Sequence, residues 1–214
     1  MSFYGQWNPP VDQVLLMNYF ENQATGTFIE CGAADGISIC CCKFFEDKGW
    51  KGINIEGENS EYQKLCQVRK SSLLNLNAAL TDHDDRVIFN GSVIQRAPNG
   101  ANGVRAVRLS TAMSEAGLKE LDLLCLDIEG HEPVVFADMM RGDIRPKVIC
   151  AEYPHCTLKA IHDVLSPEYS MDGISFNNVY FSLKDLKVRR PFWGRTCECY
   201  LSNGQWVFPE KAEY

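Results

Sequence analysis

Apolar runs of strand length alternate with segments of helical periodicity along most of this chain. The runs end at or near polar residues and predict β-strands, and the segments between them carry apolar residues three or four positions apart and predict α-helices. The expected strands are Thr27–Glu30, Lys51–Glu56, Leu73–Leu76, Leu121–Ile128 and Lys147–Glu152. The expected helices are Val11–Glu21, Ile37–Lys48, Asn59–Lys70, Ser110–Ala116, Pro133–Arg141 and Thr157–Leu165.

Two segments depart from this alternation. Arg86–Leu109 contains turn signals at Pro98-Asn99-Gly100 and Asn102-Gly103, which predict an excursion of short strands. Tyr169–Leu183 alternates in two runs around Asn177-Asn178, which predicts a terminal antiparallel pair. The whole pattern predicts an α/β, Rossmann-like fold, with a mainly parallel sheet flanked by helices and a terminal antiparallel pair.

Nothing in the pattern divides the chain. It contains no repeat, no low-complexity tract and no linker long enough to separate domains. We therefore expect residues 1–214 to form a single domain, with residues 1–26 as an N-terminal segment packing on it and residues 192–214 as an aromatic-rich tail.

The polar residues that follow the predicted strands form one expected neighbourhood. Ligands of parallel α/β sheets bind beyond the carboxyl ends of the strands. This rule brings together Glu30–Gly36, Glu56, Asn77-Ala78, Asp127–Glu132 and Glu152–His155.

The first strand ends in a glycine-rich turn with the spacing Glu-x-Gly-x-x-x-Gly, formed by Glu30, Gly32 and Gly36. It differs from the Gly-x-Gly-x-x-Gly turn that binds dinucleotides. An acid at the strand end repels a pyrophosphate but suits a cofactor that carries an ammonium group or hydroxyls, such as S-adenosylmethionine. Glu56 ends the second strand about 20 residues further on, where a ribose-binding acid is found in Rossmann-like units. The pair of acids favours a methyl donor over a nicotinamide cofactor, and a plain strand-to-helix turn is the alternative without function.

A second motif follows the most apolar strand. It consists of Asp127, Glu129, Gly130, His131 and Glu132. Acids near a helix start are explained without function by the helix dipole, and this reading suits Glu132. Asp127 lies too deep in the strand for that role, so we interpret it as functional.

Composition and charge narrow the choice of partners. The formal net charge of −7 argues against nucleic acid as a main partner, because phosphate binding needs a basic surface. The basic residues Lys184, Lys187, Arg189, Arg190 and Arg195 are best explained as a solvated face.

Ten cysteines are a high number for 214 residues. Cys40, Cys41 and Cys42 are expected on the first helix after the glycine turn and point in different directions, which does not indicate a disulfide framework. A zinc site at His155-Cys156 with Cys197 and Cys199 is disfavoured, because Cys-x-Cys differs from the usual knuckle spacing. No apolar run reaches the length of a membrane span and no leader pattern is present, so we expect a reduced, cytoplasmic protein.

The two motifs together resemble the FkbM-like family of S-adenosylmethionine-dependent methyltransferases. The resemblance rests on Glu30–Gly36, Gly49–Glu56, Asp127–Glu132 and Glu152, and it covers about residues 12–183. It implies a class I methyltransferase fold and methylation of hydroxyl groups, often on sugars of glycans, glycolipids or secondary metabolites. The chain departs from the family pattern at Glu30, at Cys125 and at Tyr153-Pro154-His155.

The resemblance also implies roles for individual residues. The backbone of Gly32, Ala33, Asp35 and Gly36 would approach the methionine part of the cofactor, and Glu30 or Asp127 would receive its ammonium group. Glu56 would accept the ribose hydroxyls, and Asn77 and Ala78 would border the adenine.

Methylation of a sugar hydroxyl needs a proton acceptor. His131 and Glu129 are the candidates, with Glu152 or His155 as alternatives, and Asp127 is assigned with them to the catalytic group. Asp127 and Glu152 are also candidate ligands of a divalent cation, Mg²⁺ or Mn²⁺.

The acceptor itself stays open. A glycan or other small-molecule acceptor is expected, and specificity is expected to lie in Arg86–Leu109 and in the tail. A homo-oligomer is possible. The alternatives are an acceptor group on another small molecule or a protein, a nicotinamide-dependent oxidoreductase, and a non-catalytic nucleotide-binding module.

Overall fold

The computed structural model describes residues 2–90, 93–98, 102–186, 192–193, 200–202 and 205–207. Its main sheet has the strand order β12-β10-β11-β9-β8-β1-β2-β3. Strands β3, β2, β1, β8 and β9 run parallel, β11 is antiparallel to β9 and to β10, and β12 is parallel to β10. Their bounds are β1 Thr27–Cys31, β2 Lys51–Glu56, β3 Leu74–Asn77, β8 Leu123–Leu126, β9 Val148–Glu152, β10 Tyr169–Ser175, β11 Asn178–Leu183 and β12 Phe192–Trp193.

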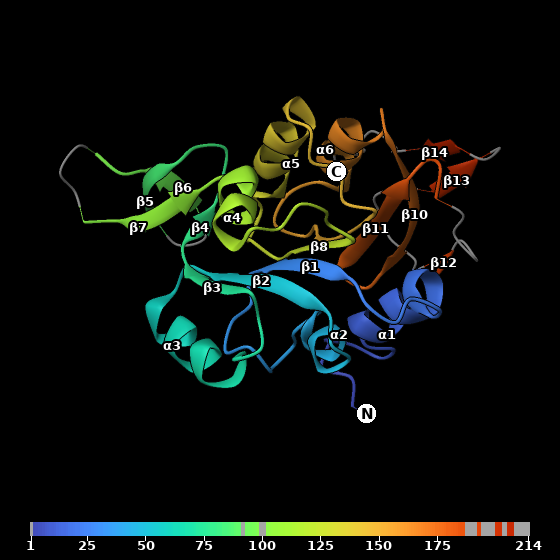
Figure 1. Ribbon diagram of the computed structural model, residues 1–214. Coiled ribbons are helices and arrows are strands. Elements are labelled where there is room, and N and C mark those ends of the chain that lie inside the picture. Colours follow the sequence, from blue (N-terminus) through green and yellow to red (C-terminus); the bar gives the residue numbers. More distant parts are fainter. Residues whose placement is uncertain are drawn as a thin grey trace.

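The predicted fold class is confirmed: the sheet is mainly parallel, carries an antiparallel pair and has helices on both faces (Figure 1). Figure 1 shows α4, α5 and α6 on one face, and α1, α2 and α3 on the other. The helices are α1 Val11–Leu15, which continues as a π-helical turn at Leu16–Phe20, α2 Lys43–Asp47, α3 Asn59–Val68, α4 Leu109–Ala116, α5 Glu132–Arg141 and α6 Leu158–Leu165.

The irregular segment forms a second, smaller sheet, as predicted. Its four strands are ordered β4-β7-β5-β6, and β4 follows β3 after a single residue. Figure 1 shows this sheet projecting beyond the β3 end of the main sheet. The bounds are β4 Ala79–Leu80, β5 Asp85–Asn90, β6 Val93–Arg96 and β7 Val104–Val107. A separate hairpin pairs β13 Tyr200–Ser202 with β14 Gln205–Val207.

Strand β1 shows how the two faces of the sheet are built. Its residues alternate, so that Ile29 and Cys31 enter the core under α4, α5 and α6, whereas Phe28 enters the core of α1 and α2. Glu30 lies on the same face as Phe28 and is buried. A buried acid in the central strand needs a partner, and this requirement shapes the candidate site.

The helix predicted at Ile37–Lys48 is much shorter than expected. Only Lys43–Asp47 is helical, and Ile39 has a positive φ of 57°. Side chains satisfy the backbone N–H groups that a helix would have used: Asp35 accepts from Ile37 and Ser38, and Glu30 accepts from Cys41 and Cys42. The three consecutive cysteines therefore lie in the loop before α2 and not on a helix.

Candidate functional site

A cavity of 920 Å³ opens beyond the carboxyl ends of β1, β2, β3 and β8. Its volume lies within the range of about 300–1,000 Å³ that is usual for pockets that bind cofactors and small molecules. Of the residues assigned to the cofactor or to catalysis, Gly32, Glu56, Asn77, Ala78, Asp127 and Glu129 line this cavity.

The floor of the cavity is the turn after β1. The N–H groups of Gly32 and Ala33 donate to the carbonyl of Ile55, at 3.0 and 3.3 Å, so the turn stays attached to β2. Gly32 has a φ of 80°, and a Cβ atom on it would lie 2.0 Å from the carbonyl oxygen of Asp127. Only glycine fits this position, because the turns after β1 and β8 come together there.

Glu56 ends β2 at the side of the cavity. Its carboxylate accepts backbone N–H groups from Ala34 at 2.8 Å and from Glu58 at 2.7 Å. The Asn77 amide donates to the carbonyl of Glu56 at 2.9 Å, which ties the end of β3 to the end of β2. Glu56 is thus held at the cavity wall, and its side chain is only partly buried.

Glu30 is buried below the cavity and does not line it, so it does not take the role expected of it toward the cofactor ammonium group. One carboxylate oxygen accepts from the N–H groups of Cys41 and Cys42, and the other lies 3.2 Å from Nη1 of the buried Arg69. Arg69 also pairs with the buried Glu46 and donates to the carbonyl of Gly36 at 3.2 Å. Glu30 therefore serves the architecture of the turn, and of the two acids proposed for the ammonium, Asp127 is the one at the cavity.

Three further residues of the glycine motif do not line the cavity. Ala33 is fully buried, and Asp35 forms the turn described above. A Cβ atom on Gly36 would lie 2.8 Å from the Arg69 side chain and 2.9 Å from that of Val68, so Gly36 allows α3 to approach. Ala34, which the sequence analysis did not single out, takes their place in the lining.

Asp127 and Glu152 end neighbouring strands, and their carboxyl groups form a hydrogen bond. Burial raises the pKa of Asp127 to about 8, with further contributions from the hydrogen bond to Glu152 and from the negative charges of Glu152 and Glu129. Asp127 lines the cavity, and Glu152 lies behind it with its side chain 13% exposed. The two residues predicted as metal ligands are thus in contact with each other.

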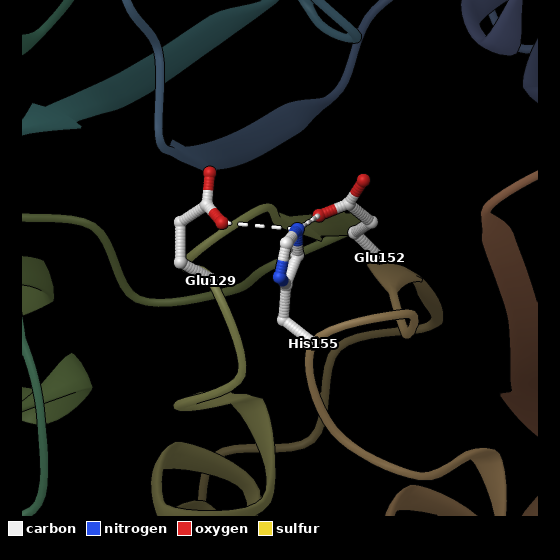
Figure 2. Close-up of side chains that lie close together, drawn as sticks. All are labelled: Glu129, Glu152 and His155. Atoms are coloured by element: carbon white, nitrogen blue, oxygen red, sulfur yellow. Dashed lines mark ion pairs between the residues drawn. The ribbon is translucent and has the colours of Figure 1, made fainter. Parts of the chain in front are cut away.

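Figure 2 shows that the side chains of Glu129, Glu152 and His155 converge. Nε2 of His155 lies 3.1 Å from the Glu129 carboxylate and 3.9 Å from that of Glu152. Glu129 has a φ of 57°, and a Cβ atom on Gly130 would lie 2.5 Å from the carbonyl oxygen of His155, so the loops after β8 and β9 are packed tightly together. Of the two candidate histidines, His155 is the one that contacts the carboxylates of Glu129 and Glu152.

His131, the first candidate for the base, lies elsewhere. It precedes α5, and its Nε2 is 2.9 Å from the hydroxyl oxygen of Thr81 at the end of β4. Burial lowers the pKa of His131. Glu132 begins α5 and accepts the N–H of Ile128 at 2.9 Å, in agreement with the reading of this acid as part of a helix start.

The small sheet supplies lining residues that the sequence analysis did not name individually. They come from β5, β6 and β7. The aromatic ring of Phe89 packs against Gly57, the residue after β2. The only sequence signal for these residues is the irregular pattern of Arg86–Leu109, the segment expected to determine acceptor specificity. These lining residues are Arg86, Phe89, Ile94, Val104 and Arg105.

Parts of two sequence-based expectations lie outside the described residues. Cys197 and Cys199 of the disfavoured zinc site, and most of the basic stretch from Lys187 onward, belong to this group. Within the ranges that the structure covers, no helix is long and apolar enough to cross a bilayer.

A Rossmann-like sheet with a cavity at the ends of its central parallel strands defines a class of enzymes that bind a nucleotide-containing cofactor. Residues 30–166 match the family model described as the methyltransferase FkbM domain. The match covers more than half of the chain, so the protein belongs to the FkbM methyltransferase family and is an S-adenosylmethionine-dependent methyltransferase. This membership confirms the resemblance and favours the methyl donor over the nicotinamide alternative.

Solved structures also resemble this chain. A TehB-like SAM-dependent methyltransferase from Corynebacterium glutamicum has 11% sequence identity and a TM-score of 0.45, over 81% of this chain and 88% of that chain. A fibrillarin/Nop5p complex has 12% identity and a TM-score of 0.40, over 74% of this chain and 71% of that chain. No curated protein matches the sequence.

Proposed function

We propose that this methyltransferase transfers the methyl group to a hydroxyl oxygen, and that the acceptor is a sugar of a glycan or glycoconjugate. The observation that carries the proposal is the group formed by Glu129, Glu152 and His155 beside the cavity. A neutral hydroxyl must lose its proton as it attacks, and a group of two carboxylates and an imidazole can accept that proton or stabilise the resulting alkoxide.

The cavity fits S-adenosylmethionine in size and chemistry. Glu56 would offer carboxylate oxygens to the ribose hydroxyls, and Gly32, which lines the cavity, would border the methionine part. Asn77 and Ala78 would border the adenine, and Asp127 would receive the ammonium group. When bound, the cofactor supplies a methyl group on a positively charged sulfur.

The protein's own residues would contribute alignment and removal of the proton. The new carbon–oxygen bond forms as the carbon–sulfur bond breaks, the electron pair of the broken bond stays on sulfur, and the hydroxyl proton passes to the carboxylate–imidazole group. Such a displacement depends mainly on holding the two reacting atoms in line and excluding water. The loops after β8 and β9 carry the residues for this task.

Two exposed aromatic residues support a sugar acceptor. The rings of Trp7 and Phe176 are stacked at 4.9 Å between centroids and are 37% and 46% exposed. Phe176 is close to the site, because its neighbour Asn177 lies 3.5 Å from the Glu152 carboxylate. An exposed apolar surface beside a group of polar side chains is typical of a binding site, and a pyranose ring has the flat apolar face that suits stacked rings.

We also propose a cytoplasmic location. The eight cysteines in the described ranges are all free thiols, as expected in a reducing compartment.

The first experiment is titration calorimetry of S-adenosylmethionine into the wild type and Glu56→Gln. Loss of the carboxylate charge should weaken binding by about 1.5–3 kcal/mol, which is roughly 10- to 100-fold in Kd. Glu168→Gln is the matched control, because Glu168 is exposed, pairs with Arg145 and does not line the cavity. Its affinity should equal that of the wild type.

A second experiment tests the acceptor. Sugars and glycoconjugates are screened with radiolabelled cofactor, alongside phenols, amines and proteins. Label that appears on a sugar oxygen supports the proposal. Label found only on nitrogen or on protein contradicts the sugar assignment, and failure of the wild type to bind the cofactor would revive the non-catalytic alternative.

A further inference from the structure

Three side chains beside the cavity present metal-binding atoms to one another. Glu129, Glu152 and His155 each offer one donor atom, and these atoms all lie within 4.8 Å of one another. Donors that share an ion at about 2.2 Å are at most about 4.4 Å apart, so a small movement completes the arrangement. Glu129 and His155 can make that movement, because their side chains are 53% and 49% exposed.

The charges around this group favour a cation. Asp127 is hydrogen-bonded to Glu152, so three carboxyl groups meet beside one imidazole. Over the ranges that the structure covers, His155 is the only basic side chain within ion-pair distance of Glu129 or Glu152. In the neighbouring strand β1, by contrast, the buried Glu30 is paired with Arg69.

We propose that Glu129, Glu152 and His155 form a binding site for one divalent cation, with Mn²⁺ as the ion best suited to it. Two carboxylates and one imidazole match Mn²⁺, because carboxylates suit Mg²⁺ and Mn²⁺ whereas a nitrogen ligand disfavours Mg²⁺. Asp127, already in contact with Glu152, lies where it can orient that ligand.

The role of the cation rests on the proposed function. The site lies next to the cavity through Asp127 and Glu129, so a hydroxyl that enters from the acceptor side can coordinate the ion. Coordination lowers the pKa of the hydroxyl, which then loses its proton to water, and it fixes the oxygen in one place. When the ion is bound, His155 serves as a ligand, and water replaces the carboxylate–imidazole group as the acceptor of the hydroxyl proton.

The test is direct binding of Mn²⁺ to the full chain, measured as the loss of the electron paramagnetic resonance signal of the free ion. The wild type should bind one equivalent, and His155→Ala and Glu129→Gln should each weaken binding at least about tenfold. Asp163→Asn is the matched control, because Asp163 is an exposed carboxylate beside His162 that belongs to no three-donor group in the described part of the chain. It should bind Mn²⁺ as the wild type does.

A spectroscopic measurement separates coordination from a structural effect. The bound ion should show magnetic coupling to one imidazole nitrogen, and the coupling should vanish in His155→Ala. Absence of binding at millimolar Mn²⁺, or equal weakening in the control variant, overturns the inference. The titration of S-adenosylmethionine needs no metal. A failure to bind Mn²⁺ therefore overturns the cation site alone, and the proposed methyl transfer is tested separately by that titration.

Discussion

Arg69 provides the sharpest test of how the turn below the cavity is held together. Its side chain is fully buried, and the guanidinium pairs with Glu30 and Glu46 and donates to the Asn54 side chain at 2.7 Å. Both acids are less than 5% exposed. Arg69→Met keeps much of the length of the side chain and removes the charge, so it leaves two buried carboxylates without a cation.

The expected loss of stability follows from this burial. Removing one partner of a buried ion pair costs about 3–5 kcal/mol, because the remaining charge stays desolvated. For a chain of 214 residues this corresponds to a fall in Tm of about 6–20 °C, measured by calorimetry or circular dichroism. Arg141→Met is the control, since Arg141 is 63% exposed and pairs with Asp138, and it should cost no more than about 1 kcal/mol.

A compensating variant decides whether the unpaired charge is the cause. Glu30→Gln and Glu46→Gln added to Arg69→Met keep hydrogen-bond acceptors in place and remove both charges. The triple variant should recover at least half of the lost stability. If Arg69→Met costs as little as the control, or if the triple variant is no better than the single one, the reasoning is refuted.

Three further predictions concern the turn, the core and the cavity. In urea denaturation, Gly32→Ala should lower the free energy of unfolding more than Gly49→Ala does. Both glycines have positive φ, and the backbone strain of an alanine there costs about 1–2 kcal/mol, but only at Gly32 would the new Cβ lie 2.0 Å from a carbonyl oxygen. Equal losses in the two variants would contradict this. Burial raises the pKa of Asp172 to about 6, above the unfolded value of about 3.9, so the folded state is stabilised by the protonated form below pH 4 and loses that stabilisation as the pH rises through 6. Asp172→Asn should therefore be more stable than the wild type by about 2–3 kcal/mol at pH 7.5 and equal to it near pH 4. A variant that is less stable than the wild type at pH 7.5 would disprove this. Phe89→Ala should weaken S-adenosylmethionine binding by roughly threefold to tenfold through lost apolar contact, whereas Phe176→Ala should leave it unchanged and raise only the KM of the acceptor.

The parallel sheet and its strand ends could be predicted because buried strands leave a simple signal. Leu123–Leu126 and Val148–Glu152 are largely apolar runs of strand length; the first is followed by Asp127 and Glu129, and the second ends in Glu152. The rule that ligands bind at the carboxyl ends then brings Glu56, Asp127 and Glu129 to one cavity. The predicted bounds of these parallel strands differ from the observed ones by at most two residues at either end.

The loop after Gly36 could not be predicted, because its conformation depends on side chains distant in the sequence. Apolar residues at Ile37–Lys48 have helical spacing, yet Glu30 accepts two N–H groups that the helix would have used. The same limit applies to the choice between His131 and His155. Both follow strand ends, and the fold separates them by placing His131 against Thr81 and His155 against Glu129.

The acids at the strand ends are distinguished by what compensates their charge. Glu30 is paired with Arg69, and Glu56 accepts two backbone N–H groups at the cavity wall. Burial raises the pKa of Asp127 to about 8, and the Glu129 carboxylate lies 3.1 Å from Nε2 of His155. The acids at the ends of β8 and β9 therefore lie beside an imidazole, whereas Glu30 lies beside a guanidinium. A sequence pattern that treats all of these acids alike does not contain this difference, because it depends on which groups the fold places beside each acid, such as the buried Arg69 beside Glu30.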